Sequence, residues 1–181
     1  MENKTYLIRE IYDSLSYDFD ETIFEFYCND INFLLGDRGT GKTTISFINA
    51  IAEASLNPRR KIGFCTDSEQ RYVYILLIEF CDKLGLDYYK DDHTLAVILP
   101  NNSYIQIMNL NNIRGHWFDY IIADMHCLFE DDYNRILVTC KDLNSFKIVT
   151  GTQTDFIYDY VHNNEPYAIL GDDHNTCHIL Y

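Results

Sequence analysis

The segment from Gly36 to Thr43 limits the possible folds of this chain more than any other feature of its sequence. It reads Gly-Asp-Arg-Gly-Thr-Gly-Lys-Thr and fits the pattern G-x-x-x-x-G-K-[ST]. Glycines allow the backbone to curl so that successive N–H groups point at phosphate oxygens. A helix that begins near Gly41 would add the positive end of its dipole at the same place. The segment therefore predicts a phosphate-binding loop, or P-loop, between a strand and a helix.

This loop predicts a site for a nucleoside triphosphate, and MgATP is the expected ligand. Lys42 is expected to bind the β- and γ-phosphates and to act in catalysis, and the Thr43 hydroxyl is expected to ligate Mg²⁺. A glycine-rich turn that happens to precede an unrelated lysine is the alternative interpretation. The residues expected to contact the nucleotide are Gly36, Asp37, Arg38, Gly39, Thr40, Gly41, Lys42, Thr43 and Thr44.

The apolar segments of the chain predict strands that alternate with helices. Strands are expected at 31–35, 61–66, 120–123 and 146–150, a hairpin at 96–108, and helices at 45–56 and 69–84. Gly85 is expected to end the second helix. Such alternation favours a mainly parallel sheet that is covered on both faces. We therefore predict an α/β fold of the P-loop NTPase class, RecA/ASCE-like, with helices on both faces of the sheet.

The size of the chain is typical of one domain. It has 181 residues, of which 47% are hydrophobic, enough to fill a core between a sheet and its helices. We expect one P-loop ATPase domain over 1–181, in which residues 1–29 form a lead-in packed on the sheet. No apolar run approaches the roughly 18 residues of a membrane span, and the N-terminus does not resemble a secretory signal. A cytoplasmic protein without a membrane partner is therefore expected.

The charge of the chain is strongly negative. Fourteen Lys and Arg residues against 28 Asp and Glu residues give a net charge of −14. A surface that coats nucleic acid non-specifically needs clustered basic residues, so this function is disfavoured. A local basic strip, or a DNA site that an oligomer or a partner completes, remains compatible with this charge.

Cysteine and histidine patterns predict no metal centre. The six cysteines include no C-x-x-C pair, and an intracellular chain would keep them as reduced, mostly buried thiols. The segment 172–178 reads Asp-Asp-His-Asn-Thr-Cys-His and holds metal-binding residue types, but no second half-site accompanies it at ligand spacing. A solvated turn is the preferred interpretation.

Asp124 is the expected second ligand of Mg²⁺. It ends the apolar run 120–123, which is where a P-loop site carries its Walker B aspartate. The alternative is an aspartate that caps the next helix. The next residue is Met125, whereas many P-loop ATPases carry a glutamate there to orient the attacking water. Slow or partner-dependent hydrolysis is therefore compatible with the sequence.

Other residues could supply the missing catalytic groups. Glu69 follows the second predicted strand and is a candidate catalytic base, but residues 66–69 also fit a capping box, and the structural role that this pattern gives Glu69 is the preferred interpretation. His126 and Glu130 follow the expected metal ligand in a loop, and structural or solvated roles are preferred for them. Arg38 could stabilise charge on the γ-phosphate in the transition state, or it could form a surface ion pair with a nearby acid.

The stretch from 30 to about 154 resembles the ATPase domain of phage and viral terminase large subunits, the motors that package DNA. Its P-loop has an arginine at the Arg38 position, as the loop of this family has. Residues 97–105 resemble the family's "lpnGs-x-I" hairpin, and residues 113–124 resemble its "iRG…fDliiiDE" signature. Residues 148–152 resemble its coupling motif. The four blocks occur in the order and spacing of the family.

The resemblance implies roles for further residues. Arg38 would act as an arginine finger in cis, and Thr150, Gly151 and Thr152 would link the state of the nucleotide to movement. A DNA-packaging motor would work in the host cytoplasm on double-stranded DNA, which it would contact through an oligomer or a partner. A homo-oligomeric ring, or a separate nuclease or portal subunit, would complete such a motor. The resembling stretch does not include the family's nuclease domain, so no DNA-cutting acidic triad is expected.

Three alternatives to this motor remain open. Met125 departs from the catalytic glutamate of the family, which favours a nucleotide-binding regulatory module with weak or no hydrolysis. A helicase-like ATPase that depends on nucleic acid would carry the same loop. A small nucleotide kinase would carry it as well, but such enzymes usually need an arginine-rich lid, and the arginines of this chain cluster nowhere beyond Arg59 and Arg60.

Overall fold

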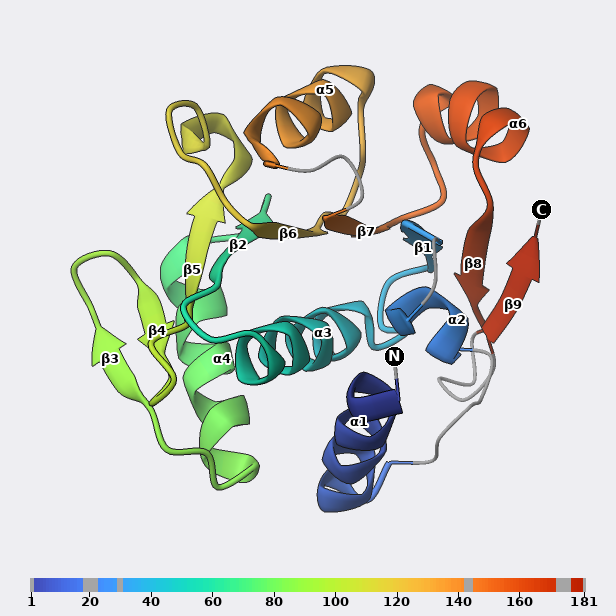
Figure 1. Cartoon of the computed structure of the whole chain (residues 1–181). Coiled ribbons are helices and arrows are strands. Elements are labelled where there is room, and N and C mark those ends of the chain that lie inside the picture. The colour runs from blue at the N-terminus through green and yellow to red at the C-terminus, as the bar shows by residue number, and fades with distance from the viewer. Residues whose placement is uncertain (1, 18–22, 29–30, 142–144, 172–176, 181) are drawn as a thin grey trace.

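One sheet organises the chain in its computed structural model, which describes residues 2–17, 23–28, 31–141, 145–171 and 177–180 (Figure 1). The nine strands found there are β1 (Phe33–Leu35), β2 (Lys61–Thr66), β3 (Tyr89–Asp91), β4 (Ala96–Ile98), β5 (Tyr104–Asn109), β6 (Tyr120–Asp124), β7 (Phe146–Thr150), β8 (Tyr167–Leu170) and β9 (Cys177–Leu180). They lie in the order β3-β4-β5-β2-β6-β7-β1-β8-β9. All pairs from β5 to β8 in this order are parallel, and β3, β4 and β9 pair antiparallel toward the edges. The predicted, mainly parallel sheet is confirmed.

Helices cover both faces of this sheet. One hydrophobic cluster joins the sheet to α1 (Glu2–Leu15), α2 (Ile23–Cys28), α3 (Lys42–Leu56) and α4 (Gln70–Lys83). A second cluster on the opposite face joins it to α5 (Glu130–Thr139), to the 3₁₀ turn Leu110–Asn112 and to the π-helical turn Ile157–Val161, which leads into α6 (His162–Asn164). Within β1, Leu34 belongs to the first cluster, whereas Phe33 and Leu35 belong to the second. This alternation is the two-residue period of a strand that is buried on both faces.

The helices predicted around the P-loop form close to the expected positions. The expected helix 45–56 is the body of α3, and the expected helix 69–84 is α4, which Gly85 ends with a φ of 62°. The proposed capping box at 66–69 is wrong, because α4 begins at Gln70 and Glu69 makes no capping bond with its side chain. The Thr66 hydroxyl instead accepts a hydrogen bond from the backbone N–H of Ser68 at 3.1 Å.

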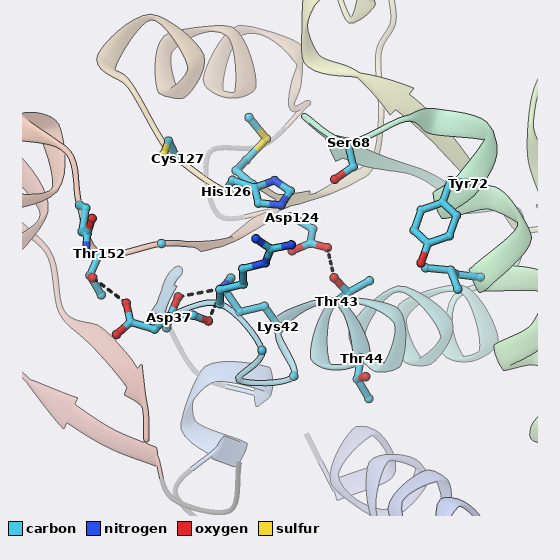
Figure 2. Close-up of a pocket in the computed structure, with 18 residues that line it drawn as sticks. Asp37, Lys42, Thr43, Thr44, Ser68, Tyr72, Asp124, His126, Cys127 and Thr152 are labelled. Carbon is cyan, nitrogen blue, oxygen red and sulfur yellow. Dashed lines mark hydrogen bonds between the residues drawn. The ribbon is translucent and has the colours of Figure 1, made fainter. Parts of the chain in front are cut away.

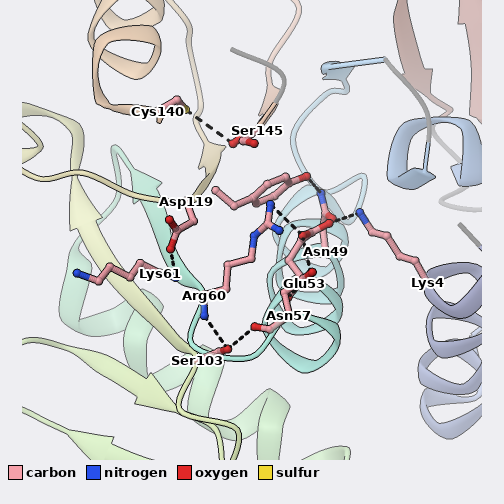
Figure 3. Close-up of polar contacts among 11 residues, drawn as sticks. Lys4, Asn49, Glu53, Asn57, Arg60, Lys61, Ser103, Asp119, Cys140 and Ser145 are labelled. Carbon is pink, nitrogen blue, oxygen red and sulfur yellow. Dashed lines mark hydrogen bonds and ion pairs between the residues drawn. The ribbon is translucent and has the colours of Figure 1, made fainter. Parts of the chain in front are cut away.

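The N-terminal lead-in is tied to the rest of the chain by packing and by charge. α1 packs against α3, and α2 lies next to β8. The Glu53 carboxylate on α3 is nearly buried and lies 2.6 Å from the Lys4 ammonium of α1 and 3.6 Å from the guanidinium of Arg60 (Figure 3). One acidic side chain thus connects α1, α3 and the residue that precedes β2.

The structure bears on three expectations, which concern the cysteines, the segment 172–178 and membrane-spanning helices. All six cysteines are free thiols, four of them buried, with Cys28 half-buried and Cys127 exposed. Within the segment 172–178, residues 172–176 lie outside the described part of the chain, and Cys177 and His178 belong to β9. Among the helices of the described residues, none combines the length and the apolar character that a membrane crossing requires.

Candidate nucleotide-binding site

A cavity of about 610 Å³ opens where the parallel strands β1, β2, β6 and β7 end. The P-loop, the first residues of α3, the residues that follow β6 and β7, and one side of α4 line it (Figure 2). The loop can form here because Gly39 and Gly41 adopt φ angles of 87° and 84°, which side chains with a Cβ disfavour. The Thr40 hydroxyl donates to the carbonyl of Asp37 at 2.9 Å and closes the turn.

Lys42 is held at the mouth of this loop. Its ammonium donates to the backbone carbonyls of Gly36 at 2.8 Å and of Asp37 at 2.7 Å. Burial lowers the pKa of Lys42, and the negative charges of Asp124, Asp37 and Asp67 oppose that shift. Each of these three acids is therefore close enough to raise the pKa of Lys42. The ammonium is in place to exchange the two carbonyl contacts for phosphate oxygens.

Thr43 and Asp124 meet across the cavity. The Thr43 hydroxyl donates to Oδ2 of Asp124 at 2.6 Å, although the two residues are 81 positions apart. Asp124 is buried at the end of β6, where burial raises its pKa while the Thr43 hydroxyl and Lys42 oppose the increase. It does not cap a helix, because the N-cap residue of α5 is Phe129.

These two side chains fit a magnesium ion that arrives with phosphate. A hydroxyl and a carboxylate are hard oxygen ligands, and Mg²⁺ takes its remaining ligands from water and phosphate oxygens. The part of the chain that the structure describes contains no group of three or more His, Cys, Asp and Glu side chains that could hold a metal by itself. Thr43 and Asp124 could supply protein ligands to a metal that a nucleotide brings with its phosphates.

The residues expected to sense the nucleotide are bonded directly to the P-loop. The backbone N–H of Gly36 donates to the carbonyl of Thr150 at 3.0 Å, and the Thr152 hydroxyl donates to Asp37 at 3.1 Å. Gly151 lies so close to the carbonyl of His126 that a Cβ atom would come within 2.4 Å of it. The end of β7 and the P-loop therefore cannot move independently without breaking hydrogen bonds.

The structure brings some of the proposed catalytic residues to this cavity and leaves others away from it. Arg38 lines the cavity and is exposed, and no ion pair with an acid holds it among the described residues. Glu69 and Glu130 are exposed and are not among the residues that line the cavity. Met125 is 4% exposed and packs in the hydrophobic cluster beneath α5. No carboxylate therefore takes its place directly after Asp124.

Residues that sequence reasoning missed also line the cavity. Ser68, Tyr72 and Leu76 reach it from the segment that begins α4, and Cys127 reaches it from the loop after β6. Asp67 contacts the lining residue His126 through two hydrogen bonds. For Asp67, Ser68 and Cys127 the available signal was position, because polar residues that follow buried parallel strands gather at one edge of a sheet, whereas Tyr72 and Leu76 lie within α4 and gave no such signal.

Comparison with known proteins gives a match of fold. No protein-family model and no curated protein matches the sequence. The large terminase of a thermophilic bacteriophage matches the structure with a TM-score of 0.64 at 14% identity, over 87% of this chain and 47% of that chain. The large terminase ATPase domain of Thermus phage P74-26 matches with a TM-score of 0.61 at 12% identity, over 83% of this chain and 72% of that chain.

The first of these terminases also matches in a nucleotide-bound form. Its complex with ATP-gamma-S has a TM-score of 0.63 at 13% identity, over 87% of this chain and 46% of that chain. This chain thus spans about half the length of that terminase. Identities this low establish the shared architecture and not the activity. The chain has the fold of the ATPase domain of phage large terminases, a P-loop fold of the ASCE type.

Proposed function

We propose that this protein binds MgATP in the cavity and hydrolyses it as a motor ATPase of the terminase type. The observation that carries this proposal is the hydrogen bond between Thr43 and Asp124, which lies beside the Lys42 ammonium. It joins the two oxygen ligands that a P-loop site uses for Mg²⁺, and they come from distant parts of the chain. A glycine-rich turn with an unrelated lysine does not explain this arrangement.

The residues of the site then have separate roles. The backbone N–H groups of the P-loop and the Lys42 ammonium bind the β- and γ-phosphates, while Thr43 and Asp124 supply protein ligands to the metal. Magnesium, when bound, neutralises charge that develops on the phosphate oxygens. Arg38 is exposed at the cavity and adds a positive charge toward the γ-phosphate as an arginine finger in cis.

Movement is transmitted through the end of β7. Thr152 is hydrogen-bonded to Asp37, and Thr150 is hydrogen-bonded to Gly36. A change in the conformation of the P-loop on loss of the γ-phosphate therefore displaces the segment from Thr150 to Thr152. The substrate polymer of the motor is double-stranded DNA, contacted through a ring of copies or a partner such as a nuclease or portal subunit. The chain 1–181 acts as one P-loop domain in this proposal, within the cytoplasm of the host.

The second candidate is a nucleotide-binding regulatory module. The observation in its favour is Met125, which is buried directly after Asp124 where a catalytic carboxylate is absent. This module would bind MgATP as tightly as the motor does but would not release phosphate. Measured turnover therefore separates the two candidates.

Phosphate release in the presence and absence of duplex DNA tests the proposal. We expect the wild type to bind and hydrolyse MgATP, and DNA to raise the rate. Lys42→Ala should lower the rate by about 100-fold or more, because one preorganised charge on the transferred group is lost. Lys83→Ala is the matched control, since Lys83 is exposed in the last turn of α4, outside the cavity. A wild type that binds no MgATP would contradict the proposal.

A further inference from the structure

Hydrolysis in this cavity needs a group that orients the attacking water. P-loop enzymes use a carboxylate or an amide for this purpose, placed beyond the γ-phosphate. Met125 offers only a thioether, which is a weak acceptor, and its side chain is packed in the core. Glu69 and Glu130 are not among the lining residues. The remaining acceptors at the end of the cavity where β6 and β7 finish include the amide of Gln153 and the ring of His126, and hydrolysis of ATP needs such a group.

His126 lies at that end of the cavity and is held in one orientation. Its backbone N–H donates to Oδ2 of Asp67 at 2.7 Å, and its ring Nδ1 lies 2.7 Å from Oδ1 of the same carboxylate. Its carbonyl accepts a hydrogen bond from the N–H of Gly151 at 3.2 Å. The residue is thus bonded to the ends of β2 and β7 while it follows β6, so three neighbouring strands fix its place.

The contact with Asp67 also determines what the ring presents to the cavity. A carboxylate has only acceptors, so Nδ1 of His126 is the donor in this pair. In the neutral form of the ring, this leaves a lone pair on Nε2, which can accept a hydrogen bond. The His126 side chain is 68% exposed and lines the cavity on the side of Asp124, whereas the Asp67 side chain is 30% exposed (Figure 2). Nε2 is therefore accessible to water in the cavity.

The pair is close to the groups that would hold the phosphates. Asp67 is one of the acids that oppose the burial-driven decrease in the pKa of Lys42. His126, Lys42 and Asp124 all line the same cavity. The pair and the phosphate-binding groups therefore share one electrostatic environment, in addition to one cavity.

We propose that His126, positioned by Asp67, orients the water that attacks the γ-phosphate and so replaces the carboxylate that is absent after Asp124. The water oxygen forms the new bond to phosphorus, the bond to the bridging oxygen breaks, and ADP leaves with that electron pair. Both protons of the water leave with the inorganic phosphate as H2PO4−, so His126 acts as a hydrogen-bond acceptor only. Asp67 is a positioning residue, because it acts through the ring. This inference rests on the proposed ATPase function.

Measurements of ATP affinity and of turnover on the same variants test this assignment. For His126→Ala we expect kcat to fall by about 100-fold, the scale of a misplaced reactant, while the Kd for MgATP changes by less than about 3-fold. His126→Gln should retain more activity than His126→Ala, because its amide oxygen can accept a hydrogen bond. The matched control is His93→Ala, since His93 is an exposed histidine whose N–H donates to Asp91 in the same way, far along the sheet at the β3–β4 turn.

The positioning role of Asp67 has its own signature. Asp67→Asn preserves size but leaves one acceptor oxygen for the two N–H groups of His126, so the ring loses its fixed orientation and tautomer. We expect Asp67→Asn to lower kcat at unchanged melting temperature, and Asp67→Asn combined with His126→Ala to be no slower than His126→Ala alone. Rate losses that multiply in the double variant would overturn the positioning role.

The outcomes separate this inference from the function on which it rests. If the wild type hydrolyses ATP and folded His126→Ala hydrolyses it equally fast, the inference is overturned and the ATPase function stands. If the wild type binds MgATP but releases no phosphate with or without duplex DNA, the inference is overturned and the regulatory module is favoured. If the wild type binds no MgATP, the proposed function itself fails.

Discussion

Cys127 is the exposed thiol among the six of this chain, and it lines the same cavity as Lys42 and Thr43. A thiol-reactive maleimide should therefore modify Cys127 first. MgATP should slow this reaction because a nucleotide that fills the cavity restricts access to the thiol. The measurement is the rate of adduct formation by mass spectrometry of intact protein, with and without saturating MgATP.

The buried cysteines provide the internal reference for this experiment. Burial raises the pKa of Cys81 to about 12, and it raises the pKa of Cys65 further, so few thiolates form at neutral pH and both should react slowly. Cys127→Ser should remove the fast phase of labelling. A fast phase that survives in Cys127→Ser, or one that MgATP leaves unchanged in the wild type, would contradict the assignment of this cavity to the nucleotide.

The sequence predicts those residues of the site that lie within one short segment better than those that meet only after the chain folds. The residues from Gly36 to Thr43 lie in one short segment, so a sequence motif can identify them. The contact between Asp67 and His126 spans 59 positions and exists only because β2 lies next to β6. The interpretation of Glu69 was limited in the same way, because the direction of its side chain depends on where α4 begins. Sequence periodicity determines that point only to within a residue or two.

At the scale of single elements, the turn of the β4–β5 hairpin closes the C-terminus of α3. The side-chain amide of Asn101 donates to the carbonyls of Ala54 at 2.7 Å and Ser55 at 3.1 Å. The hydroxyl of Ser103 donates to the carbonyl of Asn57 at 2.5 Å. The last carbonyls of a helix have no partner within it, so the hairpin supplies the donors that they need.

Asn101→Ala should therefore destabilise the fold. The variant loses three hydrogen bonds, two to carbonyls of α3 and one that Oδ1 accepts from the N–H of Ser103, which corresponds to about 1–3 kcal/mol in the free energy of unfolding. Urea denaturation, followed by far-UV circular dichroism, measures this value. Asn102→Gly is the matched control, because the exposed Asn102 has a φ of 66° that glycine adopts without strain. A loss in Asn101→Ala no larger than that in Asn102→Gly would contradict a capping role for the turn.

Strand length and burial explain which elements the sequence could predict. The predicted strands β2, β6 and β7 have five or six residues each, nearly all buried, and such apolar runs stand out. The strands β3, β8 and β9 have three or four residues and lie toward the edges, with exposed positions in β3 and β9. Their pairing depends on neighbours already in place, which local periodicity does not report.

At the scale of the whole molecule, buried charge connects the N-terminal helix to the P-loop helix. Glu53 lies between Lys4 and Arg60, and the side-chain amide of Asn57 donates to Glu53 at 3.3 Å (Figure 3). α3, which carries Glu53 in its interior, begins at Lys42 in the P-loop. A buried carboxylate needs its partners, so loss of α1 would leave Glu53 with less compensation. This arrangement supports one cooperative unit that includes both the lead-in and the nucleotide site.

The effect of MgATP on thermal unfolding tests whether the lead-in and the nucleotide site unfold as one cooperative unit. If the chain unfolds as one domain, MgATP at 100 times its Kd should stabilise the whole fold by about 2.7 kcal/mol, and a single transition should shift upward in temperature. Differential scanning calorimetry counts the transitions, and near-UV circular dichroism, to which all 15 tyrosines of the chain contribute, follows the loss of tertiary packing. Lys42→Ala is the matched control and should show no shift at the same ATP concentration. Two transitions, of which MgATP shifts only one, would contradict a single cooperative unit.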